Sequence, residues 1–378
     1  MVPYILLLAL PILPIIAPFS YYKKKKQQFA IVSFFLILFL LLAFRGYEVG
    51  TDISSYIYLY YAVGNAPWSS LFATSNIINE GGYSIFEKLV FSICGNHFSS
   101  FSFRIFLVVA AFVSIVPLTI LYCKESNNAT LTIALFVGVA PFSMFFSGLR
   151  ETIAISFGAV AWLFLSRKKI VFYFFFVFLA FLFHQSAVVL LLLFPLSFVS
   201  LRKKHLPAIL LLVVLLFLFR VQLFGVLTNI LPRYSNYYYS IQNTGAYGFL
   251  FLLLVFLAFC FLVPNERALD SKTFLLRNIL VLMVFIQVFS SISTIIMRVN
   301  YYFLILIPIL VPKIIDSSMN NNKQIVATAN VVMIIFFPLY FIVKGCCGTD
   351  LLEIFPYIPF WESTFHHPYS LIEELLNS

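Results

Sequence analysis

Long apolar runs separated by short polar junctions follow one another along almost the whole chain. A helix that crosses a bilayer needs about 20 mostly apolar residues. Candidate runs cover 3–20, 29–44, 103–123, 129–147, 151–166, 170–183, 186–200, 206–224, 247–263, 273–296, 301–315 and 325–343. The stretch from 170 to 200 is divided at His184 and Gln185, because polar side chains there would otherwise lie in lipid. The pattern predicts an all-α fold, that of a polytopic integral membrane protein with about 12 transmembrane helices.

Composition supports this prediction. Hydrophobic residues make up 62% of the chain and charged residues 10%, whereas soluble domains are about 25% charged. The first apolar run precedes the first charged residue, Lys23, so we expect a retained helix rather than a cleaved signal peptide. The stretch 52–63 looks amphipathic and predicts a helix along the membrane surface.

The basic residues mark one side of the membrane. Most of the 24 lysines and arginines gather at alternate junctions, namely 23–26, Lys124, 167–169, 202–204, Arg267 with Lys272 and Arg277, and Lys313 with Lys323. The positive-inside rule makes these junctions cytoplasmic. The net charge of +10 is therefore a topology signal, and we expect no nucleic-acid partner.

The opposite, outer face then carries both termini and nearly all the long loops. We expect one transmembrane helical domain over 1–343, with outer loops at 45–102 and 225–246 and an outer C-terminal tail over 344–378. The cytoplasmic connections are short and basic. Any chemistry or recognition is therefore expected on the outer face.

Arginine predominates over lysine among the outer basic residues. The outer arginines are Arg45, Arg104, Arg150, Arg220, Arg233 and Arg298. A guanidinium grips phosphate in bidentate fashion and stays charged in a partly dry site. Arg150, Arg298, Arg45 and Arg220 are therefore candidate ligands of an anionic group. The alternative is that these side chains snorkel to the interface and anchor the helices.

Arg150 and Glu151 interrupt "MFFSGLRETIAISFGAV", which would otherwise be one apolar stretch. Ionisable residues near membrane depth usually point into a bundle or an aqueous cavity. A structural salt bridge between the two residues is the alternative. Ala154, Gly158 and Ala161 follow at helical spacing and predict a face suited to close helix packing.

Three outer side chains are candidate acid–base groups: His184, Glu151 and Asp52. An imidazole titrates near neutral pH, so His184 can serve as a base or as a phosphate ligand. A hydrogen-bonded interface histidine is the alternative. Asp52 is expected to orient an arginine or a sugar hydroxyl. The alternative is that Thr51 or Asp52 caps an interfacial helix through backbone N–H groups.

Tyrosines interleaved with Asp, Asn, Ser and Thr suit carbohydrates, whose C–H faces stack on rings while their hydroxyls find polar partners. Tyr56, Tyr238, Tyr301 and Tyr302 are the candidate sugar-binding residues, although an interfacial aromatic belt explains many outer aromatics. The five cysteines show no metal-ligand spacing, and no glycine-rich phosphate loop occurs. We expect neither a metal nor a cofactor.

Four sequence blocks occur in the order known from one family. "FRGYEVGTDISSYIYLY", "SGLRETIAISF", "LAFLFHQSAVV" and "MRVNYYFLILIPIL" resemble the arginine, histidine and tyrosine motifs of EpsG-like, Wzy-type polysaccharide polymerases. The blocks extend from about 40 to 315, with a looser match near "FPYIPFW". Each block is weakly specific, and the ordered set carries the resemblance.

The resemblance implies an enzyme of the bacterial inner membrane that joins oligosaccharide repeat units carried on undecaprenyl diphosphate at the periplasmic face. The partners so implied are the lipid-linked oligosaccharide, membrane lipid and a chain-length regulator protein. In this reading Arg45 helps to frame the diphosphate. A lipid-linked oligosaccharide flippase or secondary transporter is one alternative, and a membrane acyltransferase with His184 as base is another.

Overall fold

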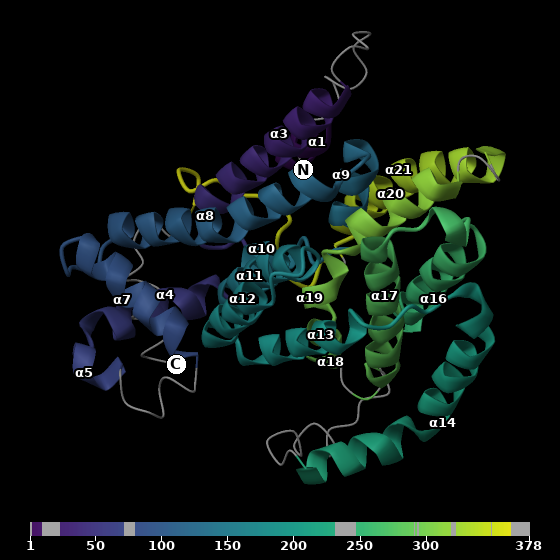
Figure 1. The fold of residues 1–378 in the computed structure, drawn as a ribbon. Helices are drawn as coiled ribbons and strands as arrows, with labels where there is room; N and C mark the ends of the chain where they lie inside the picture. The colour runs from purple at the N-terminus through teal and green to yellow at the C-terminus, as the bar shows by residue number, and fades with distance from the viewer. Residues whose placement is uncertain are drawn as a thin grey trace. The chain divides into compact units, whose positions relative to one another are not determined.

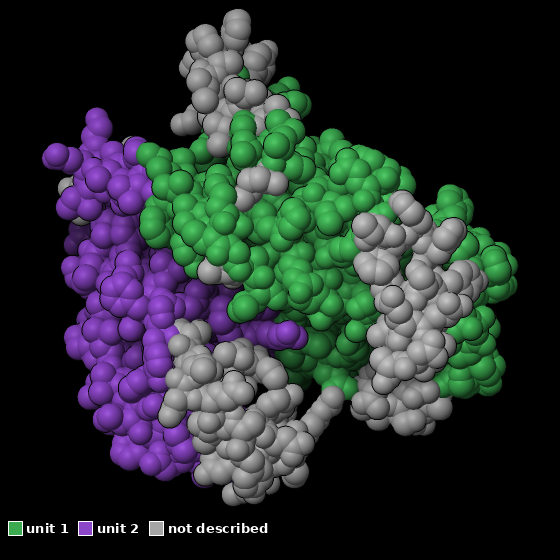
Figure 2. All heavy atoms as spheres, turned by 180° about the vertical axis from the view of Figure 1, so that it is seen from behind, with its two compact units in different colours: residues 1–188, 334–378 green, residues 189–333 purple. Residues whose placement is uncertain are grey.

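The structure of the chain is a computed structural model, and it describes residues 2–9, 23–71, 80–230, 247–290, 292, 295–318, 323–348 and 350–363. Within these ranges the regular elements are all helices (Figure 1). They form two compact units (Figure 2), one of residues 1–188 with 334–378 and one of residues 189–333. The chain thus leaves the first unit and returns to it near its C-terminus.

The first unit is built around α8, which packs against α3 and α11, while α11 also packs against α12. Its helices are α1 (Val2–Ala9), α3 (Lys23–Ala43), α4 (Ile53–Asn65), α5 (Trp68–Leu71), α7 (Gly81–Ile93), α8 (Ser100–Glu125), α9 (Ala129–Gly138), α10 (Met144–Ser147), α11 (Leu149–Leu165), α12 (Ile170–Phe183) and the later part of α21 (Lys323–Cys346). The predicted small-residue face of α11 is confirmed, because Ala154, Gly158 and Ala161 are buried.

The stretch 45–102, predicted to be an outer loop, is largely helical in its described part. The helix predicted at 52–63 is confirmed as α4, whose buried residues include Ile53, Tyr56, Ile57 and Tyr60 at helical spacing. Its position along the membrane surface stays a prediction. This face joins α7 and α8 in one aromatic-rich core. Burying the tyrosine-rich stretch in this way fixes α4 beside the start of α11.

The C-terminal stretch 350–363 lies along the chain that leaves α3. Arg45 and Pro359 form an isolated antiparallel bridge, and Gly46 N donates to Ile358 O at 2.7 Å. Further along, Gly50 N donates to Glu353 O at 3.1 Å. These contacts bring the "FPYIPFW" stretch beside the "FRGYE" stretch, over 300 positions earlier in the chain.

A glycine is required at position 50. Its φ is +104°, a conformation that residues with a side chain rarely adopt. A Cβ at this position would also lie 2.0 Å from the carbonyl oxygen of Phe146. The turn after α3 can therefore approach the residues just before α11 closely.

The second unit is built around α17, which packs against α14, α16 and α20. Its elements are the end of the 3₁₀ helix η2 (Gln185–Leu192), α13 (Leu193–Leu196), η3 (Lys203–His205), α14 (Leu206–Ile230), α16 (Tyr247–Leu262), η5 (Glu266–Ala268), α17 (Ser271–Phe289), α18 (Ile295–Val299), α19 (Tyr301–Leu304), α20 (Ile307–Ser318) and the start of α21.

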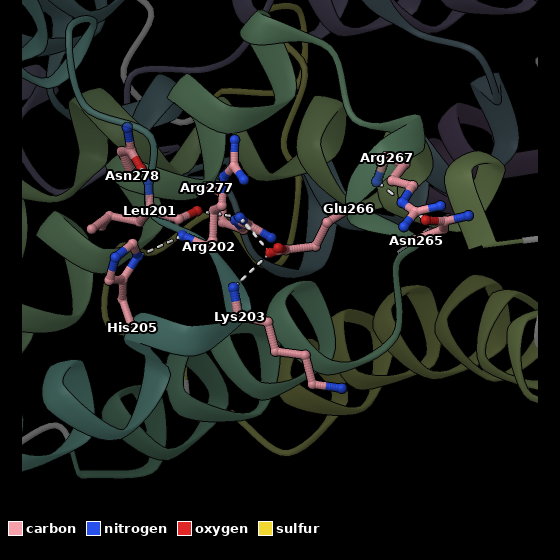
Figure 3. A network of polar contacts seen from close by, with 9 residues as sticks. All are labelled: Leu201, Arg202, Lys203, His205, Asn265, Glu266, Arg267, Arg277 and Asn278. Atoms are coloured by element: carbon pink, nitrogen blue, oxygen red, sulfur yellow. Dashed lines mark hydrogen bonds and ion pairs between the residues drawn. The ribbon is translucent and has the colours of Figure 1, made fainter.

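Two basic junctions of this unit are joined by polar contacts (Figure 3). Glu266 Oε1 accepts from Lys203 N at 2.6 Å and from Arg277 Nη2 at 3.0 Å. Asn278 Nδ2 donates to Leu196 O at 3.1 Å and to Val199 O at 2.7 Å. The start of α17 thereby holds the connection that precedes α14.

The number of spans differs from the sequence prediction. Five helices of the described chain are long and apolar enough to cross a membrane: Lys24–Ala43, Ser100–Glu125, Lys203–Val226, Ser271–Phe289 and Lys323–Cys346. The pair Ile296–Leu304 and Ile307–Ser318, bent by 51°, makes a sixth if it counts as one span. These helices make the chain a polytopic membrane protein, but the prediction of 12 spans is not supported.

Part of the excess in that prediction comes from runs that are apolar but structurally short, while most of the predicted run 3–20 lies outside the described residues. Helix α12 has 14 residues and is therefore about 21 Å long, against a hydrocarbon core of about 30 Å. Helix α9 has only 10 residues. The predicted break at His184 is confirmed, because α12 ends at Phe183 and His184 has extended backbone.

Candidate active site

One carboxylate of the first unit contacts both an arginine and a histidine. Glu80 Oε2 lies 2.6 Å from Arg150 Nη1, and Glu80 Oε1 lies 2.5 Å from His184 Nδ1. The side chain of Arg150 is 41% exposed and that of His184 28%, against 14% for Glu80. The carboxylate thus lies beneath two groups that remain accessible to a ligand.

Glycine places Glu80 beside His184. Glu80 immediately precedes α7, and a Cβ on Gly82 would lie 2.7 Å from Leu182 Cβ and 2.9 Å from Leu182 O. Only a residue without a side chain lets the start of α7 approach the end of α12 this closely. Glu80 itself has a φ of 67°, which is uncommon for a residue other than glycine.

Arg150 stands in the first turn of α11, and Ser147, the last residue of α10 just before it, is held to the residues that precede α4. Ser147 Oγ lies 2.9 Å from Thr51 Oγ1 and accepts from Asp52 N at 3.2 Å. The guanidinium of Arg150 lies 5.8 Å from the ring centroid of Tyr56. Two residues selected from the sequence, Arg150 and His184, therefore meet at Glu80. Tyr56 lies beside Arg150, and Asp52 lies one helical turn from Tyr56.

Asp52 stands at the N-cap of α4, yet its side chain makes no capping hydrogen bond. The capping alternative left open by the sequence is therefore not what the structure shows. The hydroxyl of the preceding residue, Thr51, instead contacts Ser147. The role of Asp52 as an acid–base group stays a prediction.

The surroundings keep Glu80 ionised. Burial by itself would raise its pKa, but the hydrogen bond from His184 and the charges of His184 and Arg150 outweigh burial and lower the pKa below its ordinary value. Glu87, one turn further into α7, is the contrasting case. Burial raises its pKa well above the ordinary value, against the smaller effects of Arg150 and of a hydrogen bond with Tyr83.

Arg45 lies elsewhere in the first unit. It is 1% exposed, donates from Nη1 to Phe145 O at 3.3 Å, and lies 5.9 Å from the ring centroid of Phe146. Burial and the nearby Arg104 lower its pKa to about 10. Glu151 is 3% exposed, so it points away from solvent at the start of α11. Their proposed roles stay predictions.

Four of the other selected residues lie in the second unit. Arg220 donates from Nη1 to Phe217 O at 2.5 Å, and its guanidinium lies 4.2 Å from the centroid of the Phe217 ring. Arg298 is exposed on α18, Tyr301 is half-buried and Tyr302 is buried on α19. Tyr238 and Arg233 fall outside the described residues. The diphosphate- and sugar-binding roles of these side chains also stay predictions.

The chemistry of the Glu80 cluster follows from its composition. An imidazole whose Nδ1 faces a carboxylate keeps Nε2 for proton transfer. A partly exposed guanidinium is a donor for phosphate oxygens. Among the described residues no three His, Cys, Asp or Glu side chains are grouped as a metal site would need. The arrangement can combine acid–base catalysis with binding of an anionic leaving group.

The sequence model of the EpsG family matches residues 28–358. No curated protein and no solved structure matches the chain.

Proposed function

Because the chain belongs to the EpsG family of Wzy-like polysaccharide polymerases, we propose that it joins oligosaccharide repeat units carried on undecaprenyl diphosphate. The product is a surface polysaccharide, either an O-antigen or an exopolysaccharide. The single observation that carries the proposal is the meeting of Arg150 and His184 on Glu80. It supports the proposal because an arginine suits the charge of a leaving diphosphate and a histidine suits the acceptor proton.

The reaction is a glycosyl transfer. A hydroxyl of the incoming unit attacks the anomeric carbon of the growing chain, and the bond from that carbon to the diphosphate oxygen breaks. Arg150 stabilises the negative charge of the departing undecaprenyl diphosphate. His184 accepts the proton of the attacking hydroxyl. Tyr56 lies beside Arg150, but it is buried in the core with α7 and α8, so its sugar-binding role stays a prediction.

We place the reaction at the periplasmic face of the inner membrane, with the C-terminal tail on the same side. The distribution of lysine and arginine supports this orientation. A chain-length regulator protein is the proposed partner.

Fusions of alkaline phosphatase test this orientation. The enzyme needs disulfides and therefore matures only in an oxidising compartment. A fusion after Lys204 should be inactive and one within 225–246 active, with equal amounts of both fusion proteins on an immunoblot. Activity after Lys204 would invert the proposed topology.

Deletion of the coding sequence, followed by gel analysis of surface polysaccharide, tests the function. We expect lipid carrying a single repeat unit and no long chains, with recovery on expression of the wild-type protein. A flippase would instead leave no repeat unit on the outer surface, and an acyltransferase would leave chains of normal length without acyl groups. Either result would overturn the proposal.

A further inference from the structure

The carboxylate of Glu80 is divided between its two partners. An arginine and a carboxylate that only stabilise a fold often form a two-bond fork. Here one oxygen contacts Arg150 and the other contacts His184. The two partners come from the start of α11 and the end of α12, and Glu80 from the start of α7. One side chain therefore sets the relative position of two groups from separate helices.

We propose that Glu80 is a positioning residue of the glycosyl transfer. It holds the proton of His184 on Nδ1, which leaves the lone pair of Nε2 for the acceptor hydroxyl, and it orients the guanidinium of Arg150 beside it. The proposal rests on the proposed function. It adds Glu80 to Arg150 and His184, and the carboxylate of Glu80 acts through these two side chains.

Charge development supports this role. When His184 takes the acceptor proton, the imidazolium lies against an ionised carboxylate, and this contact stabilises the charged form. The lowered pKa of Glu80 keeps that carboxylate ionised at neutral pH. A guanidinium carries five N–H donors, and that of Arg150 contacts Glu80 through Nη1. Because the side chain of Arg150 is 41% exposed, it retains donors for the diphosphate.

The titratable groups near Glu80 lie on α4, α7 and α11 and at the end of α12. Arg150 lies on α11 and His184 at the end of α12. Tyr56 lies on α4, which Asp52 precedes. On α7, burial favours the neutral forms of Tyr83 and Glu87 by raising the pKa of each. Glu80 is thus the carboxylate in direct contact with both Arg150 and His184.

The isosteric substitution Glu80→Gln tests the proposal. The full-length protein is reconstituted in lipid nanodiscs with the undecaprenyl-diphosphate-linked repeat unit, and initial rates are measured against pH and donor concentration. We expect kcat to fall about 10²-fold, less than the roughly 10⁴-fold loss for a buried triad aspartate, because His184 is partly exposed. The acid-side midpoint of the rate profile should move to lower pH, because the amide no longer stabilises the imidazolium.

Glu48→Gln is the matched control, because it replaces another hydrogen-bonded glutamate of the first unit. Glu48 accepts from Ser363 Oγ at 2.9 and 2.7 Å, and these bonds involve neither Arg150 nor His184. It should leave the rate and the midpoint unchanged. A Glu80→Gln protein with a wild-type rate overturns the proposal. A slower protein with an unshifted midpoint and a lower Tm also overturns it, since Glu80 would then be only structural.

The tautomer of His184 separates this proposal from the proposed function, because its measurement needs no substrate. In ¹⁵N-histidine spectra at pH 8, His184 should carry its proton on Nδ1 in the wild type and lose that preference in Glu80→Gln. The signal is assigned by its absence from His184→Gln. If the wild type forms no polymer but shows the Nδ1–H tautomer, the function fails and the Glu80 contact stands. The opposite tautomer in an active wild type overturns the role of Glu80 alone.

Discussion

Replacing His184 with alanine should slow chain elongation by about 10²–10⁴-fold, the usual contribution of a general base. The fold should persist, because the contacts that end α12 are made by the backbone. His184 N donates to Ala180 O at 2.9 Å, and His184 O accepts from Ala187 N at 3.0 Å. Initial rates in nanodiscs and the ladder of chain lengths on a gel measure the effect.

His205→Ala is the control for this variant, since His205 contacts the backbone N of Arg202 in the second unit. The wild-type pH profile then identifies the role of His184. A base requires the neutral imidazole, so the rate should fall as the pH drops and the imidazole becomes protonated. A rate that rises as the pH drops would make His184 a cationic ligand of the diphosphate. Normal chains from His184→Ala would exclude both roles.

Arg150→Lys should lose about 10²–10³-fold in kcat/KM, the scale for removing a group that stabilises charge in the transition state. The planar guanidinium can contact Glu80 through Nη1 while its other nitrogens bind phosphate oxygens. An ammonium is a compact point charge and cannot reproduce this geometry. Rates measured against donor concentration, at matched protein levels, give the loss.

Arg167→Lys offers a closely matched control. Arg167 follows the other end of α11, is 39% exposed, and has its Nη2 3.9 Å from Glu125 Oε1, so it too is a partly exposed arginine near a glutamate. This variant should polymerise normally. Long chains from a well-expressed Arg150→Lys protein would remove Arg150 from the diphosphate site.

Part of the site could be predicted from single residues in their local context. His184 breaks an apolar run, and Arg150 interrupts another, and both breaks cost too much in lipid to be incidental. Glu80 was missed because its partners are distant in sequence, with Arg150 lying 70 positions further on. The available signal was the Glu80-Gly81-Gly82 triplet, in which an acidic residue precedes two residues that permit close helix approach.

The helix count could not be predicted because hydropathy measures composition and not length in space. The break of the run 170–200 at His184 was predicted, but the sequence did not show that α12 and the 3₁₀ helix η2 on either side of it are too short to cross a membrane. The stretch 301–315 likewise includes the bend of 51°. Where a helix bends depends on the residues packed against it, which no local window contains. Amphipathic α4 was predictable because its buried positions recur at helical spacing.

The closure of stretch 350–363 on residues 44–51 has a consequence for biosynthesis. The ribosome makes Gly50 about 300 residues before Glu353, its hydrogen-bond partner, and at 5–20 residues per second this interval is roughly 15–60 s. During that time the backbone N–H groups of Gly46, Gly50 and Thr51 await acceptors that have not yet been translated. A nascent chain released before residue 350 cannot complete this region, so premature termination there should yield a substrate for membrane quality-control proteases.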